Sequence, residues 1–106
     1  SSMFFNDTLS IDEASREVLS DETAPVVIEA MKEKLKELAN DAFEASNIKP
    51  LIKQIQKETG IKGRNLFMPI RIAVSGQMHG PELPLLIEVL GKEKAINHID
   101  QVMSQL

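Results

Sequence analysis

Residues 62–91 read KGRNLFMPIRIAVSGQMHGPELPLLIEVLG, and this run decides the fold that the sequence predicts. Between residues 66 and 74 its apolar side chains recur with the period of a helix. The β-branched residues in this stretch would also suit a strand, but Pro69 would disrupt a central strand. The segment 77–81 (QMHGP) predicts a turn, and Pro84 suits the first turn of another helix. The run therefore predicts two helices that meet at a proline-containing corner.

The same helical periodicity continues through the rest of the chain. We expect helices over residues 11–19, 25–40, 44–59, 63–75, 84–90 and 92–105. The connections are short, as they are between packed neighbouring helices. The sequence thus predicts an all-α fold, a compact multihelical bundle of about six short helices, with an arrangement of two helical subclusters meeting near residues 40–45 left open.

Capping and helix-breaking residues refine these boundaries. Ser10 is expected to cap the first helix, with Glu13 three residues on completing a capping box. Because proline is tolerated in a first turn, Pro50 places the regular start of its helix near Lys49. Pro69 is expected to bend or start the fourth helix. Glycines are expected to end three of the helices: Gly60, Gly76 and Gly91.

Helical periodicity also predicts which side chains are buried. Ile11, Ala14, Val18 and Leu19 are expected to form the apolar stripe of the first helix. The fourth helix is expected to contribute to the core through Leu66, Phe67, Met68 and Ile70. His98, alone on the last helix, is expected near the surface, because a lone helical histidine is more often solvated or structural than a ligand.

Charge is distributed unevenly over the 106 residues, whose net charge is −4. Residues 1–45 hold 11 acids and 4 bases, whereas residues 46–80 hold six bases and one acid. A basic middle section between acidic flanks can attract phosphate even when the whole chain is acidic. Taken without any motif, such charges more often mark solvated helix faces.

Composition excludes several classes of function. The chain has no cysteine, so disulfides, zinc–thiolate sites and a cysteine nucleophile are excluded. No phosphate-binding glycine loop is present, and His79 and His98 have no second metal ligand at a suitable spacing. Its aromatic residues are four Phe, with no Trp or Tyr, which argues against a sheet-type stacking platform. The sequence predicts a binding module with no catalytic residue and no metal.

Residues 1–3 (SSM) are typical of a cloning scar, so the helical domain is expected to span residues 4–106 and to be part of a longer protein. No apolar run is long enough to span a bilayer, and no secretory signal begins the chain. We therefore expect a cytoplasmic protein without a membrane partner.

The run from Gly63 to Glu93 resembles the C-terminal, helical anticodon-binding region of bacterial glutamyl-tRNA synthetases, which are class I aminoacyl-tRNA synthetases. The elements that carry the resemblance are the following: Gly63, Leu66-Phe67-Met68-Pro69, Arg71, Gly76, His79-Gly80-Pro81-Glu82-Leu83-Pro84 and Leu90-Gly91-Lys92-Glu93. The weaker pattern upstream of Gly60 extends this resemblance to all but the leading residues. It implies an all-helical domain that reads the anticodon loop of tRNA-Glu.

The resemblance also implies a parent enzyme. Such an enzyme joins glutamate to tRNA-Glu with ATP and magnesium, through a glutamyl-adenylate formed in an upstream catalytic domain. The HIGH-type and KMSKS-type motifs of that domain do not occur here. The chain is thus expected to be non-catalytic and to contact the parent's upstream domains as well as tRNA.

By the same resemblance, Arg71 corresponds to an arginine that contacts the anticodon loop, and the following turn packs against an anticodon base. The expected RNA-binding residues are Arg71, Gln77, His79, Gly80, Pro81 and Leu83. From charge alone, four residues are expected to attract phosphate: Lys53, Lys57, Lys62 and Arg64. Gly80 stands where some family members have a hydroxyl residue, so a side-chain hydrogen bond is not expected there.

Two other interpretations remain open from the sequence. The first is a helical protein-interaction module whose apolar groove takes a partner helix. The second is the related helical domain of a class I lysyl-tRNA synthetase. Whether the parent charges only tRNA-Glu or also tRNA-Gln is left open as well.

Overall fold

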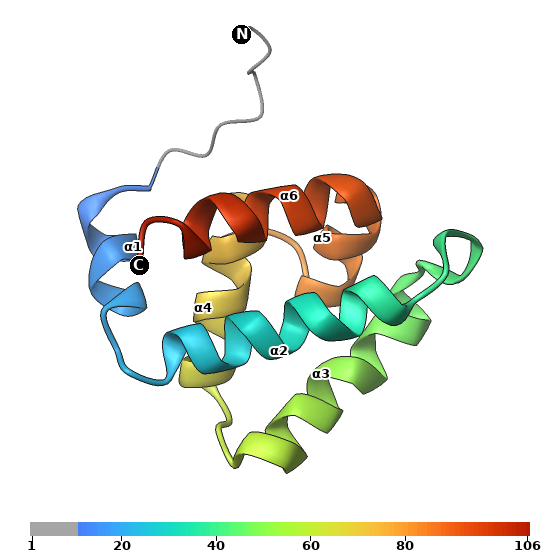
Figure 1. Cartoon of the computed structure of the whole chain (residues 1–106), viewed down its shortest axis with the longest axis horizontal. Coiled ribbons are helices and arrows are strands. Elements are labelled where there is room, and N and C mark those ends of the chain that lie inside the picture. Colours follow the sequence, from blue (N-terminus) through green and yellow to red (C-terminus); the bar gives the residue numbers. More distant parts are fainter. Residues whose placement is uncertain (1–10) are drawn as a thin grey trace, which may run out of the picture.

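A computed structural model describes residues 11–106, which form six α-helices and no strand (Figure 1). The helices are α1 (Glu13–Leu19), α2 (Ala24–Glu37), α3 (Ala45–Thr59), α4 (Arg64–Ser75), α5 (Leu83–Leu90) and α6 (Lys92–Met103), with a short 3-10 helix η1 (Asn40–Ala42) after α2. The predicted all-α bundle is confirmed. Residues 1–3, interpreted as a cloning scar, lie outside the described residues.

Helix α2 is central to the bundle. It contacts α1, α3, α4 and α6, and Figure 1 shows α6 and α3 on opposite sides of it. The buried apolar side chains of the described residues form a single cluster, to which all six α-helices contribute. Its large, fully buried members are Ile28, Met31, Leu35, Ile48, Ile55, Leu66, Ile70, Ile72, Ile87 and Ile99.

Glycines end α3 and α4 as predicted. Gly60 and Gly76 adopt the left-handed conformation, with φ of 76° and 73°. Each donates its N–H to the carbonyl four residues earlier, on Gln56 and Ile72 respectively. An L side chain disfavours this conformation, so glycine is the residue that terminates these helices at least cost.

The first helix begins later than predicted. Asp12 is its N-cap, and its carboxylate accepts a hydrogen bond of 2.8 Å from the N–H of Ser15. This bond lowers the pKa of Asp12. The predicted cap, Ser10, lies outside the described residues, and the capping box is wrong because Glu13 is the first residue of the helix. The predicted stripe is also shifted, since Ala14 is exposed and Ser15 is buried.

Two prolines lie inside helices, within the predicted ranges 44–59 and 63–75, so a regular start near Lys49 and a start at Pro69 are both wrong. Pro50 and Pro69 are each the sixth residue of α3 and α4, so these helices begin at Ala45 and Arg64 and not at the prolines. A proline removes one hydrogen bond to the carbonyl four residues earlier. Here these carbonyls belong to the exposed first-turn residues Ser46 and Asn65, where water can replace the missing partner.

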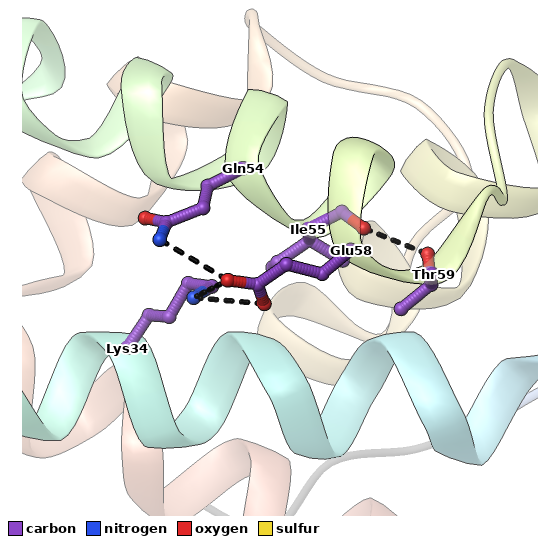
Figure 2. Close-up of polar contacts among 5 residues, drawn as sticks. All are labelled: Lys34, Gln54, Ile55, Glu58 and Thr59. Atoms are coloured by element: carbon purple, nitrogen blue, oxygen red, sulfur yellow. Dashed lines mark hydrogen bonds and ion pairs between the residues drawn. The ribbon is translucent and has the colours of Figure 1, made fainter.

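An ion pair fastens the C-terminal half of α3 to α2 (Figure 2). The ammonium of Lys34 lies 3.2 and 3.4 Å from the two carboxylate oxygens of Glu58. Gln54 donates to the same carboxylate at 3.1 Å, and the Thr59 hydroxyl donates to the Ile55 carbonyl at 2.7 Å. These contacts fix the end of α3 and therefore the position of its outer, basic face.

Polar contacts also join α6 to α2 and α4. Lys92 donates to the carbonyls of Lys36 and Leu38, at 3.0 and 2.8 Å, where α2 ends. His98 is 6% exposed, and its Nδ1 lies 2.7 Å from the Val74 carbonyl of α4. The prediction that His98 lies near the surface is therefore wrong, because this contact satisfies the ring inside the core.

Candidate functional site

Helix α4 presents a stripe of three non-core side chains to one side of the bundle. Arg64, Phe67 and Arg71 follow one another at spacings of three and four residues, so they share one face. Leu66 and Ile70, on the other face, are fully buried. The buried face anchors α4 in the core, and this anchoring fixes where the stripe points.

Arg71 is held against the turn that follows α4. Its Nη1 donates a 2.8 Å hydrogen bond to the carbonyl of Pro81. Gly80 lies so close that a Cβ added to it would be 3.2 Å from the same Nη1. Arg71 is half-buried, and the other N–H groups of its guanidinium can still bind an acceptor. The turn therefore orients the guanidinium of Arg71 and leaves most of its N–H groups able to bind a ligand.

Two hollows adjoin this arginine. One, of about 310 Å³, lies among α3, α4 and the start of α5 and is lined by Lys49, Ile52, Lys53, Phe67, Arg71, Glu82, Leu83 and Pro84. The other, of about 510 Å³, lies between α4 and the turn and is lined by Gly63, Arg64, Phe67, Met68, Arg71, Met78, His79 and Gly80. Phe67 and Arg71 line both hollows, so these two side chains form the border between them.

Phe67 is a residue of this site that sequence reasoning missed. It was predicted as core with Leu66, Met68 and Ile70, but it is 42% exposed, while Met68 is half-buried. The signal that could have identified it is its spacing, because Phe67 precedes Arg71 by four residues and therefore shares its face. An aromatic ring beside a guanidinium gives the site both a stacking surface and a donor.

Cations outnumber acids in the first hollow. Lys49, Lys53 and Arg71 line it together with a single carboxylate, that of Glu82. Lys49 and Lys53 are exposed, so their ammonium groups remain hydrated and can reach a ligand at the surface. The arrangement favours a ligand that combines an apolar or aromatic part with negative charge.

The sequence matches a known protein family over nearly its whole length. Residues 1–103 match the model of a family described as an anticodon binding domain. The chain belongs to this family. Anticodon recognition is therefore the role of the domain.

The anticodon binding domain is also similar to part of a solved enzyme. This is a glutamate tRNA ligase from Elizabethkingia meningosepticum CCUG26117 in complex with its amino acid. The two share 32% sequence identity with a TM-score of 0.78, over 92% of this chain and 19% of that chain. The chain thus spans about a fifth of that ligase. The resemblance to glutamyl-tRNA synthetases is confirmed, and the alternative interpretations are not favoured.

The structure brings together most of the residues that the sequence singled out in this domain. Lys53, Arg64, Arg71, His79, Gly80 and Leu83 line one or both hollows. Pro81 takes part through its carbonyl. Gln77 is exposed in the same turn, and its N–H bonds to the Ser75 hydroxyl at 3.1 Å. Lys57 and Lys62 are exposed but line neither hollow, whereas Lys49, which was not among the predicted phosphate-attracting residues, lines the first.

Within residues 11–106, no group of three or more His, Cys, Asp or Glu side chains could hold a metal ion. No helix in this part of the anticodon binding domain is long and apolar enough to cross a membrane. His79 lines the second hollow and His98 lies in the core, so the two histidines occupy different environments.

Replacing Gly80 by alanine is expected to weaken binding of an anticodon stem-loop by about threefold to tenfold. The new methyl group would lie 3.2 Å from Nη1 of Arg71, so the end of this side chain would have to shift by a few tenths of an ångström and its hydrogen bond to the Pro81 carbonyl would be weakened. It would also strain a residue whose φ is 148°, at a cost of about 1 kcal/mol. Fluorescence anisotropy measures the affinity. Gly60→Ala is the matched control, since Gly60 also has positive φ but an added Cβ would contact nothing. Equal affinities for the two variants would contradict this positioning role.

Proposed function

We propose that this chain is the anticodon-recognition module of a glutamate–tRNA ligase and that its partner is the anticodon loop of tRNA-Glu. The observation that carries the proposal is the guanidinium of Arg71, bonded to the turn at Pro81 and bordered by two hollows. An unpaired loop offers both base edges and phosphates to such a group.

The proposed parent joins glutamate to tRNA using ATP and magnesium in a catalytic domain outside this sequence. The similarity to a glutamate tRNA ligase supports this parent. In the proposed division of labour, the present chain contributes no step of bond making. It binds the anticodon loop of the tRNA and so helps to select which tRNA receives glutamate. The parent would act in the cytoplasm, where its tRNA substrate is found.

The exposed cations around the hollows predict how strongly RNA affinity depends on salt concentration. Lys49, Lys53 and Arg64 are exposed cations that line the hollows. If each neutralises one phosphate of a single-stranded loop, affinity should fall about twentyfold when salt rises from about 50 to about 200 mM. Removing one lysine should lower the slope of this dependence by about 0.7.

The test is a fluorescence-anisotropy titration of the whole chain with labelled stem-loops over that salt range. The stem-loop of tRNA-Glu should bind more tightly than an otherwise identical stem-loop whose three anticodon bases are replaced. The tRNA-Gln and tRNA-Lys loops, tested in parallel, measure how far the discrimination extends. Equal affinity for the native and replaced anticodons would contradict the proposal, and so would the absence of binding at low salt.

A further inference from the structure

The position of Phe67 is not explained by the fold. Phe67 is 42% exposed, whereas Phe43 is 8% exposed and belongs to the core. Leaving a large aromatic ring in water forgoes part of the free energy that burial would provide. Because α4 is already anchored by its buried face, Phe67 is available for a ligand.

The hollow beside Phe67 has the composition of a nucleotide site. Its apolar part comes from Ile52, Leu83 and Pro84, and its charged part from Lys49, Lys53, Arg71 and Glu82. Its volume, about 310 Å³, is at the low end of the range for small-molecule sites, which is about 300 to 1,000 Å³. It can accept one small planar group and an accompanying anion.

We propose that this hollow is the subsite for one unpaired nucleotide, whose base stacks on the ring of Phe67 and whose phosphate lies against Lys49 and Lys53. This inference rests on the proposed function, because the anticodon loop supplies the nucleotide. Proteins recognise single-stranded RNA by stacking splayed bases on aromatic or arginine planes. Arg71 lines the same hollow and can donate to the edge of the stacked base.

The charges distinguish this occupant from a partner helix. An amphipathic helix fits an apolar groove, and its apolar face gains nothing from the lysines here. A phosphate group, in contrast, is attracted by the positive charges of both Lys49 and Lys53. Glu82 is the single acid among the charged residues of this hollow, so it directs the phosphate toward the lysines of α3. Being only an acceptor, its carboxylate suits an amino group on the base.

The test compares two substitutions of one ring. Phe67→Leu keeps an apolar side chain and removes the aromatic face, so stem-loop affinity should fall about ten- to a hundredfold. Phe67→Tyr keeps the face and should bind within about twofold of the original chain. Val89→Ala is the control for exposed apolar surface, since Val89 is 74% exposed and lines neither hollow. The thermal midpoints of all three variants should stay close to that of the original chain.

The stacked nucleotide is then located with abasic stem-loops, each lacking one base of the loop. At one loop position, removing the base should weaken binding to the original chain. The same removal should not weaken binding to Phe67→Leu any further, because the ring and that base are then energetically coupled. A 2-aminopurine at that position should lose fluorescence on binding the original chain but not the leucine variant.

Three outcomes separate the two proposals. If the original chain does not bind the stem-loop, the proposed function fails and this inference fails with it. If the original chain binds and Phe67→Leu binds equally well, the subsite is wrong while the proposed function stands. If Phe67→Leu weakens every abasic stem-loop by the same factor, the ring has no particular base partner, and the subsite is again wrong.

Discussion

Replacing Arg71 by methionine is expected to lower the affinity for the tRNA-Glu stem-loop about ten- to a hundredfold. A guanidinium that pairs with a base edge is worth about 1 to 3 kcal/mol of discrimination. Methionine preserves the aliphatic stem and its packing on α4 but removes every donor. Because Arg71 is half-buried and its protein partner is a single carbonyl, the free energy of unfolding should change by less than about 1 kcal/mol.

Arg71→Lys separates charge from geometry. Lysine keeps the positive charge and therefore the salt dependence, but it cannot present a planar fork to a base. We expect it to retain non-specific binding and to lose most of the preference for the native anticodon over a replaced one. Anisotropy titrations of the original chain, Arg71→Met and Arg71→Lys, each with the native and the replaced anticodon loop, measure this preference. If Arg71→Lys discriminated as well as the original chain, base reading by Arg71 would be contradicted.

Replacing Leu35 by alanine is expected to destabilise the domain by about 2 to 5 kcal/mol. Leu35 is fully buried on α2, the helix that contacts α1, α3, α4 and α6. Its truncation removes apolar burial and leaves a cavity that the surrounding close-packed core cannot fully close. Since domains of this size have a total stability of about 5 to 15 kcal/mol, the loss would be a large part of it. Urea unfolding followed by circular dichroism measures the change.

Leu85→Ala is the matched control, because it makes the same chemical change on α5 at a residue that is 45% exposed. It should cost less than about 1 kcal/mol and leave the slope of the urea transition unchanged. The midpoint of thermal unfolding should drop by about 10 °C or more for Leu35→Ala only. Similar losses in the two variants would contradict the central place of α2 in the core.

Local signals were sufficient to predict the helices. Helical periodicity located all six, and the glycines at 60 and 76 marked helix ends because their left-handed conformation is disfavoured by other residues. The prolines were harder to interpret. Pro50 and Pro69 are allowed inside α3 and α4 because the carbonyls they leave unpaired lie in exposed first turns, and such exposure depends on tertiary packing.

Two side chains show where helical periodicity was applied too coarsely. Phe67 was assigned to the core for its hydrophobicity, although its spacing from Arg71 places it on the outer face. His98 was assigned to the surface for its polarity, although it lies three residues after the buried Ala95 and four before the buried Val102. In both cases position on the helix determined burial, and residue type did not.

The site divides into a part that the sequence predicts and a part that only packing creates. Arg71 and the turn at Pro81 are ten residues apart, so a short connection brings them together, and the resemblance had already paired them. The first hollow instead requires α3 to lie beside α4 and α5. Lys49 joins the site through that juxtaposition, which no pattern within α3 specifies. Whether these residues contact RNA stays a prediction.

The most direct test of the central claim, that RNA docks where Arg71 meets the turn, is chemical-shift mapping of the ¹⁵N-labelled chain with the tRNA-Glu stem-loop. We expect the largest changes at the backbone N–H of Phe67, Gln77 and Gly80 and at the side-chain Nε–H of Arg71. Residues of α1, outside both hollows, should shift little. Binding that shifts α1 and leaves Arg71 and Gly80 unchanged would contradict the account.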